Sequence, residues 1–288
     1  MDLNGDGFDD IVTGSYTGEL YWFQGSKDGF SQRDVIRDRD AKPLETGHSV
    51  TVEAHDLDAD GDLDLLVGQR TDAVRWYLNE GSRKEPKYSN KPTDLKDVKG
   101  GLIKGSNAQW IDWDGDAQRD LIVGSEWGAV TWYRHIPGQG SLVFESGIDL
   151  VAKQEFSENK EPFVPQAPGT RVKTRVVDWN GDGRMDLLVG DVSWATREKE
   201  PLDPKLAEER DGLMPKWEAL RKQVAERSRV RAEKVKAKTW TPEDQKRHHE
   251  YIDQEYAPMS ETMRKFKANE VHVVHGFVWI YLRAKKTA

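Results

Sequence analysis

The feature that most constrains the fold is an acidic nine-residue segment that occurs four times along the chain. Its copies begin at Asp2, Asp56, Asp112 and Asp178, so successive starts lie 54, 56 and 66 residues apart. A period of this length is typical of repeat architectures, in which each copy is one small structural unit that packs on its neighbours. The sequence therefore predicts a row of four similar units.

Strand patterns flank the copies of this segment. Apolar residues at alternate positions precede the last three copies, as at Val50, Val52 and Ala54, and this alternation is typical of a strand. After each copy comes a short continuous apolar run that ends in glycine. Such a run is expected for a strand that is covered on both faces. The runs are Ile11–Gly14, Leu65–Gly68, Leu121–Gly124 and Leu187–Gly190, and aromatic return strands follow at Leu20–Phe23, Val74–Tyr77 and Val130–Tyr133.

An insertion separates the apolar run of the fourth copy from its return strand. The run ends at Gly190, but the return strand resumes only at Gly276. The intervening sequence is highly charged and contains two helix starts, Asp203-Pro204 and Thr241-Pro242, with a capping side chain before a proline. The tryptophans of the four return strands are then Trp22, Trp76, Trp132 and Trp279.

The interrupted fourth copy suggests three parts of the chain. We expect residues 1–195 to form the repeats, with the first repeat truncated because no strand precedes its acidic segment. Residues 196–270 are expected to form a charged helical insertion. Residues 271–288 would complete the fourth repeat and end in a C-terminal tail.

The acidic segments carry the chemistry of a calcium site. Ca²⁺ takes about six to eight oxygen ligands, and short carboxylates at alternate positions of a tight turn can converge on it. Positions 1, 3 and 5 supply Asp or Asn side chains, position 7 a main-chain carbonyl, and position 9 a further Asp. We expect up to four Ca²⁺ ions. The candidate ligands are Asp2, Asn4, Asp6, Phe8 and Asp10; Asp56, Asp58, Asp60, Asp62 and Asp64; Asp112, Asp114, Asp116, Gln118 and Asp120; and Asp178, Asn180, Asp182, Arg184 and Asp186.

Glycine at position 6 of the segment permits the positive φ that the chain reversal needs. The third copy has Ala117 there, so its site is expected to be the least secure in geometry. An EF-hand loop begins in a similar way but needs a bidentate Glu at position 12, where these copies have Thr13, Val67, Val123 and Val189. A simple polar turn is the common explanation for one such segment, but four copies in register with strands argue against it.

These acidic segments, with their Leu-Leu-Val-Gly-type runs and return strands, resemble FG-GAP (or VCBS) repeats, which are known from integrin alpha subunits and many exported bacterial proteins. The resemblance covers about residues 1–194 and 271–283. It implies an all-β fold, a β-propeller with Ca²⁺ bound between the first two strands of each blade. It also implies an extracellular, periplasmic or cell-surface location.

The number of blades is left open by the sequence. About four blades are expected, either closed into a four-bladed ring or forming part of a larger propeller. Because the first acidic segment follows Met1 directly, we expect upstream sequence that would hold further blades or an export signal, and no signal peptide is seen in this chain.

Composition narrows the range of partners. A formal charge of −8 and a pI near 5.5 argue against nucleic acid or an anionic membrane surface. No apolar run approaches the roughly 18 residues of a membrane span. No Gly-x-Ser-x-Gly, P-loop or His-Glu-x-x-His motif occurs.

We therefore expect a non-enzymatic module for adhesion, glycan binding or protein interaction. A carbohydrate-active enzyme of the polysaccharide lyase type, built on a calcium-bound propeller, is one alternative. A purely structural domain of a larger exported protein is another. Candidate residues for stacking on sugar rings are Trp113, Trp127, Trp179 and Trp194.

Overall fold

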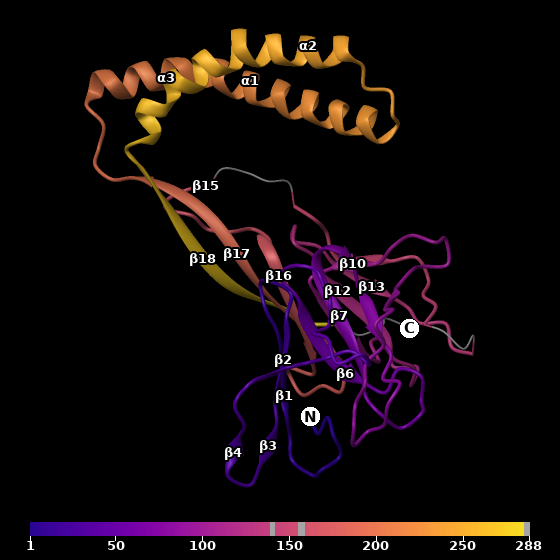
Figure 1. Ribbon diagram of the computed structural model, residues 1–288. Helices are drawn as coiled ribbons and strands as arrows, with labels where there is room; N and C mark the ends of the chain where they lie inside the picture. The colour runs from indigo at the N-terminus through magenta and orange to yellow at the C-terminus, as the bar shows by residue number, and fades with distance from the viewer. Residues whose placement is uncertain (139–141, 155–158, 285–288) are drawn as a thin grey trace. The chain divides into compact units, whose positions relative to one another are not determined.

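The computed structural model describes residues 1–138, 142–154 and 159–284, and most of its regular structure is β (Figure 1). The chain divides into two compact units. A β-rich unit comprises Met1–Ser157, Val164–Trp194 and Val274–Ala288, and a second unit comprises Glu158–Phe163 and Ala195–Val273.

The last three acidic segments each join two paired antiparallel strands of one small sheet, and the first leads directly into β1. The first sheet has the order β1-β2-β5, and the second has β10-β7-β8-β9 with β6 also paired to β7. Their strands are β1 (Ile11–Gly14), β2 (Leu20–Phe23), β5 (Asp34–Val35), β6 (Thr51–His55), β7 (Asp64–Ala73), β8 (Arg75–Tyr77), β9 (Thr93–Asp94) and β10 (Lys104–Gly105), and a separate hairpin is formed by β3 (Gly25–Ser26) and β4 (Gly29–Phe30).

The third and fourth sheets follow the same plan. The third has the order β11-β12-β13-β14, and in the fourth β17 pairs with β15, β16 and β18. Among the described residues, no sheet closes on itself. The strands are β11 (Asn107–Ile111), β12 (Asp120–Gly124), β13 (Val130–Tyr133), β14 (Ile148–Val151), β15 (Asn159–Lys160), β16 (Thr170–Val177), β17 (Asp186–Glu198) and β18 (Glu270–Tyr281).

The apolar runs form the middle strands, and their alternation explains how the sheets pack. Leu66, at the centre of the second run, lies in one core cluster with Leu121 and Val123 of the third run. Ile122 lies likewise with Leu187 and Val189 of the fourth run. Because successive strand side chains point to opposite faces, the central residue of each run faces the next sheet while its two neighbours face the preceding one.

Side chains of the inner strands tie adjacent sheets together. The backbone N–H of Trp110 in β11 donates to Glu53 in β6 over 3.3 Å, and the backbone N–H of Val176 in β16 donates to Gln109 in β11 over 2.9 Å. Glu53 and Gln109 both lie three residues before an acidic segment. The repeat therefore fixes the contacts between sheets as well as the fold of each sheet.

The predicted grouping of Trp279 with the other return-strand tryptophans is wrong by one residue. Val12 pairs with Trp22, Leu66 with Trp76 and Ile122 with Trp132. In the fourth repeat, the hydrogen bond from the N–H of Arg283 to Asp186 corresponds to that from His135 to Asp120, so Ile280 is the residue equivalent to these tryptophans. Trp279 packs on the opposite face, in the core shared with the third repeat. A one-residue slip reverses every side chain of a strand, so matching by residue type alone chose the wrong face.

The second unit contains the helices. They are α1 (Pro204–Lys236), α2 (Pro242–Tyr251), the π-helical turn η1 (Ile252–Tyr256) and α3 (Ala257–Lys267). Both helix starts predicted from the sequence are confirmed: Asp203 accepts the N–H of Lys205, and Thr241 forms a capping box with Asp244. Trp217, Met263 and Phe266 form a small buried core.

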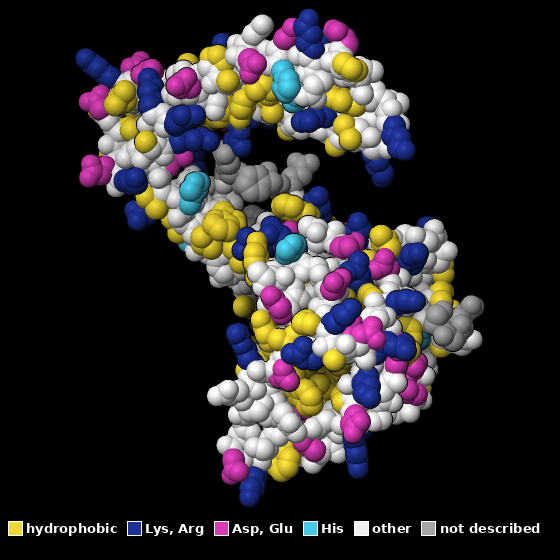
Figure 2. Space-filling model, viewed as in Figure 1, with side chains coloured by type: hydrophobic (Ala, Val, Ile, Leu, Met, Phe, Trp, Pro, Cys, Tyr) yellow, Lys and Arg dark blue, Asp and Glu magenta, His cyan; other side chains and the backbone are white. Residues whose placement is uncertain are grey.

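The surface of the helices carries charges of both signs. Arg229, for example, pairs with Glu226 and Glu233 on the same helix. Figure 2 shows blue and magenta side chains interspersed along the helices. Within the described ranges, no helix has both the length and the apolar character that a bilayer crossing requires.

Candidate metal centres and an arginine-lined cleft

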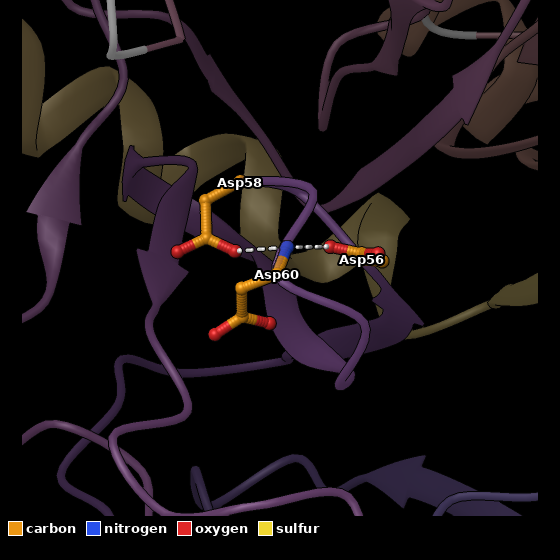
Figure 3. Close-up of side chains that lie close together, drawn as sticks. All are labelled: Asp56, Asp58 and Asp60. Atoms are coloured by element: carbon orange, nitrogen blue, oxygen red, sulfur yellow. Dashed lines mark hydrogen bonds between the residues drawn. The ribbon is translucent and has the colours of Figure 1, made fainter.

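The acidic segments fold into turns that their own side chains hold together. In the second loop, the N–H of Asp60 donates to Asp56 over 3.1 Å and to Asp58 over 3.3 Å (Figure 3). The N–H of Gly61 donates to the second oxygen of Asp56, and that of Asp62 donates to Asp60. The first and fourth loops have the same bonds, and in the third the N–H of Gly115 takes the place of that of Asp116 as a donor to Asp112. Positions 1, 3 and 5 are therefore held by local hydrogen bonds.

Carboxylate oxygens converge in these turns. In the second loop, one oxygen each from Asp56, Asp58 and Asp60 lie within 4.8 Å of one another, and Asp112, Asp114 and Asp116 do the same in the third. The first and fourth loops have Asn at position 3, and the amide oxygens of Asn4 and Asn180 accept the N–H of position 5. The second and third loops thus bring together oxygen atoms that could hold a metal ion, and the first and fourth have the same local turn with Asn at position 3.

Two positions of each loop adopt positive φ. Position 6 does so at Ala117, with φ 68°, as it does at the glycines of the other loops. Position 4 does so as well, and there the second loop has Ala59 with φ 64°. The left-handed region costs an L-residue roughly 1 kcal/mol. The strain at Ala117 was predicted from the sequence, but the equivalent strain at Ala59 was not.

The Asp at position 9 connects each loop to its return strand. In the second repeat, the two oxygens of Asp64 accept the N–H groups of Leu57 and Asn79 over 3.2 and 2.7 Å. All four position-9 carboxylates are buried. A carboxylate oxygen can accept two hydrogen bonds. Each oxygen that accepts one N–H therefore keeps a lone pair with which it could bind a metal ion, as predicted for position 9.

Burial makes these carboxylates difficult to keep charged without a cation. Burial raises the pKa of Asp64 to about 6, and it also raises the pKa of Asp120. In the second loop, burial and then the charges of Asp60 and Asp56 raise the pKa of Asp58. One oxygen of Asp120 is buried with no hydrogen-bond partner among the described residues. A bound cation would offset each of these costs, so the residues fit a metal such as Ca²⁺.

Arginine side chains lie beside two of the loops. Arg134 contacts Asp114 over 3.1 Å and Asp116 over 2.7 Å in the third loop. Arg184, whose carbonyl was a predicted ligand, pairs through its side chain with Asp182 in the fourth loop. Phe8, Asp62 and Gln118 occupy the same position 7 in the other loops. A guanidinium at the third loop competes with a metal ion for the same oxygens.

A family comparison agrees with this repeat geometry. The model of the FG-GAP-like repeat matches residues 2–67 and 112–189, which include all four acidic loops and amount to half of the chain. The chain belongs to the FG-GAP repeat family. No curated protein matches it significantly. The helices of this FG-GAP protein lie outside the matched segments.

Beside the loops, the FG-GAP repeats surround a cleft of about 840 Å³. Its walls come from the inner strands β6, β11 and β16 and from the third and fourth loops. Four arginines line it. They could not be grouped from the sequence, because each comes from a different and distant segment. They are Arg119, Arg175, Arg184 and Arg283.

One hydrogen-bonded chain crosses the cleft. Arg119 lies 3.2 Å from Nδ1 of His55, and Nε2 of His55 lies 3.0 Å from Glu53. Arginine can only donate, so Nδ1 accepts and the proton of a neutral His55 is on Nε2. Burial disfavours the charged form of Glu53, but hydrogen bonds from His55, Gln109 and the N–H of Trp110 outweigh it and lower the pKa of Glu53.

The candidate sugar-stacking tryptophans differ in exposure. Trp127, Trp179 and Trp194 are exposed. Trp113 is buried in the core between the third and fourth sheets, so it is not available to stack on a sugar ring. The guanidinium of Arg283 covers its ring at 4.9 Å. Trp113 at position 2 points into the core because the neighbouring sheet covers this side of its loop.

Proposed function

We propose that this FG-GAP protein is a calcium-binding β-propeller segment that acts as a binding module outside the cytoplasm. The observation that carries the proposal is the repetition of one oxygen-rich turn four times, with the N–H of position 6 donating to the position-1 Asp each time. The hard carboxylate and amide oxygens suit Ca²⁺. Each ion would bind at positions 1, 3 and 5, with the carbonyl of position 7 and the Asp of position 9.

The propeller would consist of the repeats in residues 1–195, completed by residues 271–288, with 196–270 as a helical insertion. FG-GAP repeats are typical of extracellular proteins, which supports the location. In this arrangement, Ca²⁺ stabilises the scaffold because it neutralises the clustered carboxylates of each loop.

The arginine-lined cleft is the proposed ligand site. Glu53, Asp112 and Asp114 line it too, but Ca²⁺ bound in the third loop would neutralise the two aspartates, and the four guanidinium groups then favour an acidic glycan. In the described part of the chain, no carboxylate lies within ion-pair distance of Arg119 or Arg283. Arg175 lies 3.8 Å from Glu53, which is a weak pairing, and its side chain is largely exposed. Carboxylate or sulfate groups of a sugar chain would pair with these guanidinium groups. The volume falls within the range of small-ligand sites, roughly 300–1,000 Å³.

The hydrogen bonds of the His55 ring favour binding without catalysis. Both of its ring nitrogens are engaged, one with Arg119 and the other with Glu53. Neither nitrogen is free to take a proton from a substrate. The enzyme alternative rests on the same cleft, where Glu53 and His55 lie among arginines; cleavage of the bound sugar chain during incubation would favour it.

Calcium titration by calorimetry tests the metal sites. About four ions should bind per chain, with dissociation constants on the order of 10⁻⁴ to 10⁻³ M or tighter. Asp60→Ala should remove one ion from this number, because Asp60 supplies an oxygen of the second cluster. Asp28→Ala, at an exposed Asp outside the loops, is the matched control. Unchanged stoichiometry in Asp60→Ala would contradict the ligand assignment.

A tetrasaccharide containing glucuronate tests the cleft. Arg119→Ala should weaken its binding at least about tenfold, equivalent to about 1.4 kcal/mol, because one charge-assisted contact is lost. The carboxyl-reduced tetrasaccharide should bind weakly to both proteins, and added salt should weaken the acidic form. Arg37→Ala, at an exposed arginine outside the cleft, is the control. Equal affinity for the acidic and reduced sugars would exclude the charge-based site.

A further inference from the structure

Neighbouring sheets of the β-rich unit pack on each other through equivalent residues. The residue two positions before the tryptophan of each of the first three return strands faces the following sheet. Leu20, Val74 and Val130 hold this position in the first three repeats, and all three are 0% exposed. Position 2 of the acidic loop faces the same way, with Leu3 and Trp113 buried in the cores that precede the second and fourth sheets.

The fourth sheet presents the same face without a following sheet. Val278 is equivalent to Val130, because each lies five residues before the residue whose N–H bonds the position-9 Asp, yet Val278 is 71% exposed. Trp179, at position 2 of the loop, is 56% exposed where Trp113 is 7% exposed. Ile280 is also exposed. This apolar face, Trp179, Val278 and Ile280, is named the trailing face.

The first sheet presents the complementary face. The outer residues of the apolar runs, such as Leu65, Leu121 and Leu187, face the preceding sheet and are nearly or fully buried. Their equivalent in the first repeat is Ile11, which is 44% exposed. Thr13 shares this side of β1 and is exposed as well. This surface, Ile11 and Thr13 with their partners Phe23 and Tyr21, is named the leading face.

We propose that the trailing face of one chain docks on the leading face of a second copy. A second copy is the expected partner because of the interfaces inside the chain. Wherever two neighbouring sheets of one chain meet, a trailing face packs on a leading face. In the part of the chain that the structure describes, one face of each kind is left uncovered. Two such contacts related by a two-fold axis would join eight sheets, which lies within the range of about four to eight blades known for propellers. The first sheet lacks an inner strand ahead of its loop, so the contact is narrower than the internal ones, and a dissociation constant on the order of micromolar is expected.

Single substitutions at exposed positions test this docking. In sedimentation experiments with Ca²⁺ present, the unaltered chain should form dimers at about 100 µM and dissociate on dilution. Val278→Asp removes the trailing face and Ile11→Asp removes the leading face, so each variant alone should be monomeric. Both side chains are exposed in the single chain, so folding should persist, which circular dichroism checks. Val164→Asp, at a residue that is 74% exposed and outside both faces, should still dimerise.

Mixing the two variants gives the decisive result. The intact trailing face of Ile11→Asp can dock on the intact leading face of Val278→Asp, so the mixture should recover dimers with one chain of each kind. A monomeric unaltered chain at about 100 µM would overturn the proposal. A dimer that is lost in Val278→Asp but kept in Ile11→Asp would overturn it too, because that pattern requires two trailing faces to meet.

Discussion

Replacing Asp186 by alanine is expected to lower the free energy of unfolding by about 3 kcal/mol, measured by urea denaturation in the presence of EDTA. Asp186 is fully buried, and its oxygens accept the N–H groups of Trp179 over 3.1 Å and Arg283 over 2.8 Å. Both donors are partly buried, and leaving such a group without a partner costs about 1–3 kcal/mol when water cannot replace the lost bond. EDTA removes the contribution of a bound metal, so the loss reports the hydrogen bonds alone.

The matching control for Asp186 is Asp28, which is exposed and lies outside the acidic loops. Asp28→Ala should change the free energy of unfolding by less than about 0.5 kcal/mol. Asp186→Asn keeps one acceptor oxygen, so its cost should lie between the two. If Asp186→Ala unfolds at the same urea concentration as Asp28→Ala, position 9 does not hold the loop to its return strand.

Removing calcium should lower the melting temperature more at pH 7.5 than at pH 5. Each site saturated at about 100 times its dissociation constant contributes about 2.7 kcal/mol, so several sites correspond to a shift of more than about 10 °C at pH 7.5. Without metal, burial holds the pKa of Asp64 at about 6, above the value of about 3.9 for an unfolded chain.

The sign of the pH effect follows from this raised pKa. The metal-free fold binds a proton at Asp64 that the unfolded chain does not, so stability from this group is greatest below about pH 3.9 and is lost as the pH rises through about 6. Protons also compete with Ca²⁺ for the same carboxylate. Differential scanning fluorimetry with EDTA, and then with excess Ca²⁺ restored, measures the difference. An equal shift at both pH values would contradict the assignment of Asp64 to a metal-linked site.

Much of the local fold could be predicted from the sequence, because the same pattern of residues occurs four times and each copy supports the interpretation of the others. The alternation in Val50, Val52 and Ala54 predicted β6, and the apolar runs predicted the middle strands. The capping residues Asp203 and Thr241 predicted the starts of two helices. In each case the signal is local, since neighbouring residues determine strand or helix.

Features that depend on contacts between distant segments were not predictable in the same way. Trp279 was grouped with the other tryptophans because residue type suggested it, but the hydrogen bond between Asp186 and Arg283 sets a register in which Ile280 takes that place. Arg134 reaches the third loop from the return strand. The cleft gathers single residues from three inner strands and two loops. None of these placements leaves a pattern within a short window of sequence.

The bond between the position-9 Asp and the end of the return strand also bears on how such a chain can evolve. It joins residues 15 apart in the first three repeats, at Asp10, Asp64 and Asp120, but 97 apart in the fourth. The same geometry therefore forms whether the hairpin closes through a few residues or through a whole set of helices. Lengthening a loop costs only about 0.6 kcal/mol per doubling. The hairpin turns of the other repeats are thus positions at which a gene insertion or an engineered graft can add a new module while the sheet of that repeat is retained.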